Sequence, residues 1–259
     1  SARPDVVMTL GHTLENADNL SPEYLAEQKA RYEGTRLGRQ ELAGELLEDV
    51  EGALWMADQI DALRVMAAPE LTRAVVAIDP AVTHTDESDE TGIVVAGVGL
   101  CVCKGSPEQH GFVLADLSGR YSPDGWARRA IGVLDMYHAD RIVAEVNNGG
   151  DLVEATLRTI DRSVPYKAVH ASRGKVTRAE PVAALFEQGK CHIVGSLPRL
   201  EDQLTTWTQG MKSPDRMDAL VWAVTELMLN GGAPLSGLSI AGANGHDKPA
   251  MAGIRSKAF

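Results

Sequence analysis

The sequence predicts a mixed α/β fold whose sheet starts with antiparallel strands. Two apolar runs, residues 74–78 and 93–103, are separated by an acidic loop, and the simplest connection between such runs is a hairpin. From residue 122 onward, helical patterns alternate with short apolar runs, which is typical of α/β units. The chain has 259 residues, 44% hydrophobic and 24% charged, which suffices for a domain-sized core.

Two helices are expected before the first strand. Ser21 is a favourable N-cap and Pro22 suits the first helical position, so a helix is expected from there to about Gly34. A second helix is expected over residues 38–54, where leucines form a stripe opposite glutamates. Residues 56–71 follow as a connector.

Five strands and five helices are expected after this connector. Apolar and β-branched residues dominate the runs assigned as strands. Ser122 starts the first of the helices as an N-cap, and Gly189 ends the third. The strands are expected over residues 73–79, 93–103, 111–117, 141–146 and 166–170. The helices are expected over residues 122–138, 151–160, 176–188, 197–207 and 214–229.

These elements divide the chain into three parts. Residues 1–71 are expected to form a helical linker, and residues 72–230 the α/β domain. Residues 231–259, rich in Gly, Ala, Ser and Pro, are expected to be a flexible tail. No run approaches the roughly 20 apolar residues of a membrane span, and the N-terminus lacks the apolar core of a signal peptide. We therefore expect a cytosolic protein, neither secreted nor membrane-bound.

Carboxylates recur where the predicted elements end or begin. Asp79 ends the first strand and Glu145 the fourth, while Asp215 and Asp218 lie three residues apart in the first turns of the last helix. Asp89, just before the second strand, is a further candidate. Each acid alone has ordinary structural uses, but acids gathered at one site repel unless a cation neutralises them. Oxygen ligands of this kind suit Mg²⁺ or Mn²⁺, and two such ions favour phosphodiester hydrolysis.

The charge distribution leaves room for a polyanionic partner. The net charge is −11, but residues 1–71 alone hold 14 acidic and 6 basic residues. Residues 162–200 hold 7 basic residues against 2 acidic ones. This local basic patch could meet phosphates, although taken alone it is better explained as a solvated basic surface.

The cysteines predict neither a disulfide framework nor a cysteine zinc site. There are three of them, Cys101, Cys103 and Cys191, and no two form a CxxC pair. We expect all three to be buried thiols in strands.

Five motifs together resemble the C-terminal nuclease domain of tailed-phage terminase large subunits, the DNA-packaging motors. They are AIDPA, DETGIVV, RIVAEVNNGGDLV, ASRGKVTRAEPVAALFEQGKCHI and SPDRMDALVWAV. The resemblance implies an RNase H-like fold, with a central five-stranded mixed sheet flanked by helices. It also implies a metal-dependent endonuclease that cuts concatemeric double-stranded DNA in the host cytoplasm.

The resemblance assigns roles to individual residues. It implies two Mg²⁺ or Mn²⁺ ions held by an acidic triad in which one residue bridges both. The triad is Asp79, which bridges, with Glu145 and Asp218; Asp215 and Asp89 are additional metal candidates. Basic residues beside the metals are expected to hold DNA phosphates without reading bases, namely Arg173, Lys175 and Arg178.

The chain is expected to be a fragment of a longer protein. Segment 32–55 resembles the part that closes the ATPase domain of these terminases, yet the chain has no GxxxxGK[ST] phosphate-binding motif. In the full-length protein the expected partners are an ATPase domain, the portal and the small terminase subunit.

Three alternatives remain at this stage. Another RNase H-like nuclease, of the junction-resolvase type, would prefer branched DNA. An actin-like nucleotide-binding module would need glycine-rich loops, but the loop after Asp79 has no glycine before Gly92. A non-catalytic assembly module would use its acids structurally, and only metal binding or cleavage can separate it from a nuclease.

Overall fold

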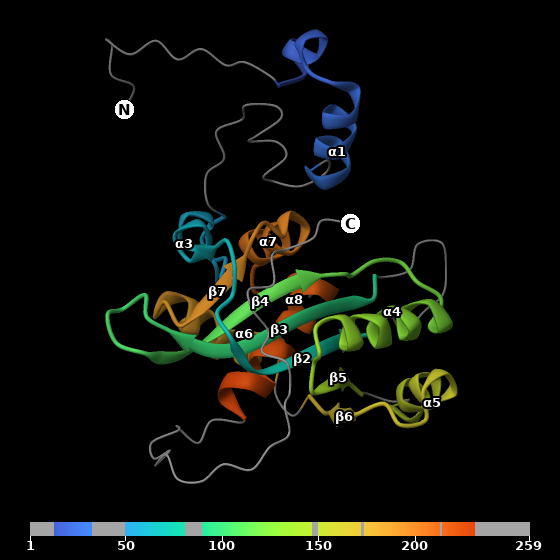
Figure 1. Cartoon of the computed structure of the whole chain (residues 1–259). Helices are drawn as coiled ribbons and strands as arrows, with labels where there is room; N and C mark the ends of the chain where they lie inside the picture. Colours follow the sequence, from blue (N-terminus) through green and yellow to red (C-terminus); the bar gives the residue numbers. More distant parts are fainter. Residues whose placement is uncertain are drawn as a thin grey trace.

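A mixed seven-stranded sheet forms the centre of the computed structural model (Figure 1). The structure describes residues 13–32, 50–80, 90–146, 150–171, 174–212 and 214–230. The strand order is β1-β7-β4-β3-β2-β5-β6. Strand β3 is antiparallel to both of its neighbours, β2 and β4, and the remaining neighbouring strands are parallel. The predicted antiparallel start and mixed α/β class are confirmed.

The sheet contains two strands that the sequence did not predict, so the expected number of five is wrong. The strands are β1 (Arg64–Val65), β2 (Leu71–Asp79), β3 (Gly92–Cys101), β4 (Glu108–Asp116), β5 (Arg141–Glu145), β6 (Tyr166–Val169) and β7 (Cys191–Val194). The missed strands, β1 and β7, have two and four residues. Neither strand is long enough to show the alternation of apolar and polar residues that marks a strand. Each pairs with a strand that is distant in the sequence.

The described helices agree with the predicted ones to within a few residues, apart from the short helix α3. They are α1 (Pro22–Tyr32), α3 (Ala57–Ala62), α4 (Pro123–Met136), α5 (Gly150–Ile160), α6 (Lys175–Glu187), α7 (Pro198–Thr206) and α8 (Asp215–Val224). A 3₁₀ segment (Thr13–Asn19) precedes α1, and one π-helical turn (Thr225–Leu229) follows α8. The helix predicted over 38–54 falls mostly outside the described residues, and residues 50–54 are not helical. The predicted tail, 231–259, also lies outside them.

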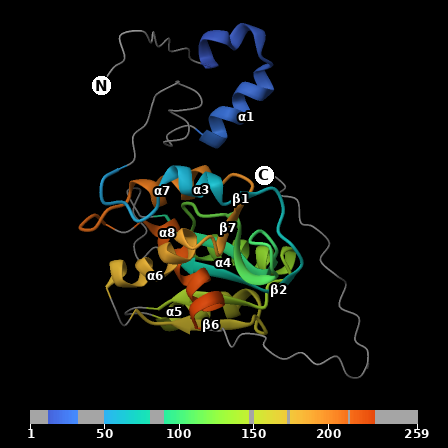
Figure 2. The ribbon, with the colours of Figure 1, turned by 90° about the vertical axis from the view of Figure 1, so that its left-hand side faces the viewer.

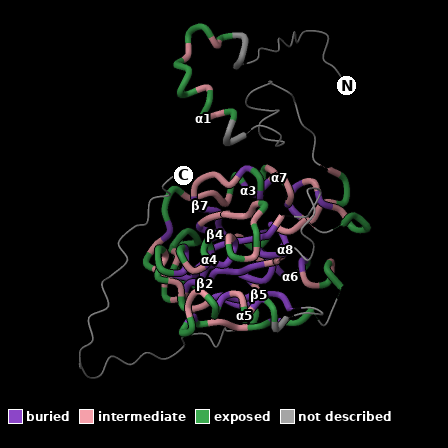
Figure 3. The backbone as a smooth tube through the Cα atoms, turned by 90° about the vertical axis from the view of Figure 1, so that its right-hand side faces the viewer, coloured by how far each residue is buried: buried purple, intermediate pink, exposed green. Residues whose placement is uncertain are grey.

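Helices cover both faces of the sheet, so its central strands are buried on both sides (Figure 3). In β2, Val76 and Ile78 pack in a cluster with residues of α4 and α5. The alternate residues Val75 and Ala77 pack with Trp222 of α8. Because both faces of β2 are buried, its residues 74–78 form a continuous apolar run without alternating polar residues. None of the described helices has the length and apolar character needed to cross a membrane.

Part of the predicted linker packs into the same structure. Trp55 and Ile60 are fully buried against residues of α6, α7 and α8. Strand β1 adds to the edge of the sheet beside β7. Figure 2 shows α3 lying next to α7, with α1 beyond them. These contacts favour a start of the structural unit before residue 72, while the three-part division itself stays a prediction.

Candidate active site

Asp79 and Glu145 end two neighbouring parallel strands. Strand β2 pairs with β5 so that Ile78 lies opposite Ala144. The next residue of each strand is an acid, and the two acids therefore reach the same edge of the sheet side by side. Glu145 is only 7% exposed.

Helix α8 begins against the same edge because a glycine allows close approach. Gly92 pairs with Asp79 across the β2–β3 ladder. A Cβ atom at Gly92 would lie 2.0 Å from the carbonyl oxygen of Asp215, where no side chain fits. Asp215 and Asp218 occupy the first turn of α8, and Asp218 is 2% exposed.

Long-range hydrogen bonds of two side chains, Gln203 and Arg216, fix the first turn of α8. No local side chain caps this helix end. Instead, Oε1 of Gln203 on α7 accepts hydrogen bonds from the backbone N–H groups of Arg216, at 3.1 Å, and Met217, at 3.3 Å. The buried guanidinium of Arg216 donates to Asp116 at 2.5 Å and to Glu90 at 2.8 Å. These contacts join the helix start to α7 and to the end of β4.

The acids lie within electrostatic range of one another. Burial raises the pKa of Asp79 well above its ordinary value, and the charges of Asp218, Glu145 and Asp215 raise it further. Lys175 opposes this rise in the pKa of Asp79. The arrangement therefore concentrates negative charge in a largely buried place.

Basic and aromatic side chains contact these carboxylates. Nζ of Lys175 lies 2.7 Å from Oδ2 of Asp218, and Nη1 of Arg178 lies 3.1 Å from Oε2 of Glu145. The same Glu145 oxygen accepts a hydrogen bond from the indole N–H of Trp222 at 2.7 Å. The guanidinium of Arg178 stacks over the Trp222 ring, 4.7 Å from its centroid. Both basic residues come from the first turn of α6, on the same side of the sheet as α8.

The structure brings most of the predicted site residues together. The residues that converge at this edge are Asp79, Glu145, Asp215, Asp218, Lys175 and Arg178. Asp89 and Arg173 lie outside the described residues. The metal-binding and DNA-binding roles of all eight stay predictions.

Three residues that support the site were not recognised from the sequence. They are Gly92, Gln203 and Arg216. Of these three, only Arg216 could have been recognised from the sequence. A cation in the first turn of a helix is unfavourable to the helix dipole, which suggests that it has acidic partners. The partners of Gly92 and Gln203 depend on tertiary packing, which no local pattern reveals.

The expectation of three buried cysteines is wrong. Cys191 is buried, but Cys101 is only partly buried and Cys103 is exposed. Both lie near His110 and His192, and the ligand atoms of these four residues are all within 4.8 Å of one another. The sequence did not reveal this clustering, because the two histidines are distant in sequence and the two cysteines have CxC spacing.

Comparison with known proteins gives one family. A family model described as the terminase RNase H-like domain matches residues 76–227. No curated protein matches the chain.

Solved structures of terminase nucleases are among those that this chain resembles. The large terminase nuclease from thermophilic phage G20c is 13% identical, with 68% of this chain and 99% of that chain covered and a TM-score of 0.45. The human cytomegalovirus terminase nuclease domain is 17% identical, with coverages of 64% and 91% and a TM-score of 0.47. For the nuclease domain of the large terminase subunit of bacterial virus Sf6, identity is 13%, the coverages are 65% and 96%, and the TM-score is 0.48.

Proposed function

The chain belongs to the terminase RNase H-like domain family, and on this basis we propose that it is the endonuclease domain of a phage DNA-packaging terminase large subunit. Its substrate would be concatemeric double-stranded DNA in the host cytoplasm. In the full-length protein, an ATPase domain, the portal and the small terminase subunit would be its partners.

The observation that carries this proposal is the convergence of four carboxylates at one sheet edge. Burial raises the pKa of Asp79, and repulsion from the other three carboxylates raises it further. Hard divalent cations relieve such repulsion, and a set made entirely of carboxylate oxygens suits Mg²⁺ or Mn²⁺. We assign Asp79, Glu145 and Asp218 as the ligands of two ions, with Asp79 shared, and Asp215 as an additional ligand. Ions at this position supply water activation and charge stabilisation at the leaving 3′ oxygen of a phosphodiester.

Neighbouring side chains orient the ligands and balance their charge. The indole N–H of Trp222 fixes one oxygen of Glu145, which restricts the rotation of that carboxylate. Lys175 and Arg178 neutralise Asp218 and Glu145 when no cation is bound. Both are also assigned to contact DNA phosphates together with Arg173, which would position the duplex without selecting its sequence.

Plasmid cleavage in Mn²⁺, Mg²⁺ or EDTA tests the proposal. Nicked and linear products are expected in either metal but not in EDTA. Asp79→Asn is expected to abolish cleavage, because it removes the charge of the shared ligand while leaving the side-chain shape unchanged. The matched control is Asp135→Asn, the same chemical change on the exposed surface of α4, which is expected to cut at the wild-type rate.

Two outcomes would contradict the proposal. Unchanged cutting by Asp79→Asn would show that the acids are not the catalytic centre. No cutting by the wild type, together with no Mn²⁺ binding by calorimetry, would favour a non-catalytic module. A four-way junction included as substrate separates the resolvase alternative, which predicts faster cutting of the junction than of linear duplex.

A further inference from the structure

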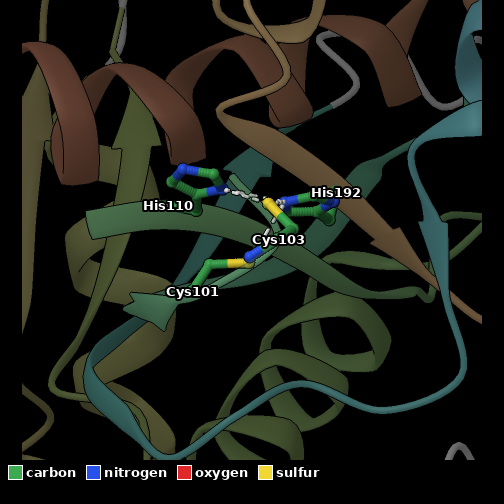
Figure 4. A group of neighbouring side chains, drawn as sticks. All are labelled: Cys101, Cys103, His110 and His192. Carbon is green, nitrogen blue, oxygen red and sulfur yellow. Dashed lines mark hydrogen bonds between the residues drawn. The ribbon is translucent and has the colours of Figure 1, made fainter. Parts of the chain in front are cut away.

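Two cysteines and two histidines converge at the end of the sheet far from the carboxylates (Figure 4). Cys101 is the last residue of β3, and Cys103 lies in the turn that follows it. His110 is on β4, and His192 is on β7. Strand β3 runs from Gly92, at the acidic site, to Cys101 over 10 residues, which separates the two ends by about 30 Å.

The distances between the four ligand atoms are close to those of a tetrahedral site. Sγ of Cys101 lies 3.8 Å and Sγ of Cys103 3.7 Å from Nε2 of His192. Sγ of Cys103 lies 3.6 Å from Nδ1 of His110, and the two histidine nitrogens are 2.9 Å apart. Ligand bonds of roughly 2.3 Å to sulfur and 2.0 Å to nitrogen give tetrahedral separations of about 3.5 Å for S···N and about 3.3 Å for N···N. These four separations differ from the tetrahedral values by a few tenths of an ångström, and the remaining pairs of ligand atoms lie within 4.8 Å of each other.

Groups around the cluster fix the orientation of both imidazoles. Nδ1 of His192 lies 3.0 Å from the carbonyl oxygen of Leu63, to which it donates, so Nε2 presents a lone pair to the cluster. Nε2 of His110 is buried without a hydrogen-bond partner among the described residues, and Oε2 of Glu108 lies 4.0 Å from it. With Nδ1 of His110 as a ligand, Nε2 carries the proton and faces this carboxylate. Metal-bound histidines commonly have such carbonyl and carboxylate partners.

We propose that Cys101, Cys103, His110 and His192 bind one structural Zn²⁺ ion. Two thiolates and two neutral imidazoles form a Cys₂His₂ set, which favours zinc over the hard cations expected at the carboxylates. Binding forms two Zn–S and two Zn–N bonds, and the two thiol protons are released to the buffer. No coordination position is left open, so this site holds the fold and performs no hydrolysis.

The ion would cross-link three strands at one end of the sheet, β3, β4 and β7, in addition to their backbone hydrogen bonds. It ties the β3–β4 turn to β7, whose neighbour β1 follows Leu63 directly. Strand β7 has only four residues, so an added link at its start has a large effect on the local stability. Zinc should therefore stabilise the side of the sheet to which β1, α3 and Trp55 belong.

Metal analysis of the whole chain tests the site. Protein purified under reducing conditions, stripped with a chelator and reconstituted with Zn²⁺ is expected to retain one zinc per chain after gel filtration. Asp79→Asn is expected to retain the same amount of zinc, which would show that the carboxylates do not bind the retained zinc. Cys101→Ser and Cys103→Ser, changes at partly buried and exposed positions, are expected to lose it. Cys191→Ala, which removes the thiol outside the cluster, is the matched control and should keep its zinc.

Cobalt substitution gives a readout independent of stoichiometry. Co²⁺ in the stripped wild-type chain is expected to show thiolate-to-metal charge-transfer absorption, which should weaken in either serine variant. Zinc is expected to raise the melting temperature of the wild type and of Cys191→Ala, but not that of Cys103→Ser. Retention of wild-type zinc by both serine variants would overturn the proposal, as would a cobalt complex without the thiolate band or a reconstituted wild type without stoichiometric zinc.

Discussion

Asp79 combines burial with three acidic neighbours, and its ionisation therefore opposes folding when no cation is bound. Its pKa in the folded chain is raised above the ordinary carboxyl value. Between the ordinary and the raised pKa, the folded chain holds a proton that the unfolded chain has lost. Stability in this window falls as the pH rises, which is the reverse of the behaviour of a salt-bridged aspartate.

Asp79→Asn should therefore stabilise the metal-free protein. In EDTA at neutral pH, the variant is expected to melt at a higher temperature than the wild type, because the amide cannot ionise. The difference should shrink as the pH is lowered to the ordinary carboxyl pKa, since both side chains are then neutral. Thermal melts over a pH series measure this, and a less stable variant at neutral pH would contradict it.

Trp222 donates one hydrogen bond to Glu145, and its ring lies beneath the guanidinium of Arg178. Trp222→Phe keeps an aromatic ring beneath Arg178 but removes the N–H donor. Loss of a partner of this kind typically lowers metal affinity or activity about 10- to 100-fold. Mn²⁺ titration and the cleavage rate should both show the loss.

Trp207 provides the matched control for this substitution. It is buried in the cluster that includes α7 and α8, and its indole N–H makes no hydrogen bond within the described residues. Trp207→Phe removes the same atoms without removing a ligand contact. Equal losses of metal affinity in the two variants would show that the effect arises from packing alone.

At the scale of elements, the site depends on how closely α8 approaches the strand β3. The contact between Gly92 and the backbone of Asp215 sets this distance, and Gln203 and Arg216 fix the helix end. Backbone atoms cannot rotate away as a side chain does. A larger residue at position 92 must therefore displace the helix start that carries Asp215 and Asp218.

Gly92→Ala is expected to destabilise the fold by about 1–3 kcal/mol, the typical cost of overpacking, and to lower the cleavage rate. Gly132→Ala is the control, because a Cβ atom there meets nothing within 4 Å. Position 132 is inside α4, where alanine is favoured over glycine by about 1 kcal/mol, so this variant should be slightly more stable. Chemical denaturation measures both, and equal stabilities would contradict the proposed contact.

At the scale of the whole molecule, the sequence predicted what local patterns encode. The buried strand ending at Asp79, the Ser122 cap and the carboxylates at element ends could all be read from neighbouring residues, and Ser122 indeed accepts the N–H of Gly125 at 3.2 Å. Strand β7 and the pairing of His110 with His192 could not be predicted in this way. Both depend on contacts between residues about 80 positions apart in the chain. The burial of Trp55 was missed for the same reason.

Under the proposed function, helix α6 would couple the binding of metal to the binding of DNA. Lys175 and Arg178 each hold a carboxylate of the site, at 2.7 and 3.1 Å. A cation bound by the carboxylates would release Lys175 and Arg178 from their ion pairs, which frees them to bind phosphates. Phosphates bound by these basic side chains would likewise release the carboxylates to bind cations. Metal and DNA would therefore strengthen each other's binding by the same factor, as linkage requires. If the proposed function holds, a domain built in this way would bind its cations weakly until a duplex is bound, so that only bound DNA would be cut.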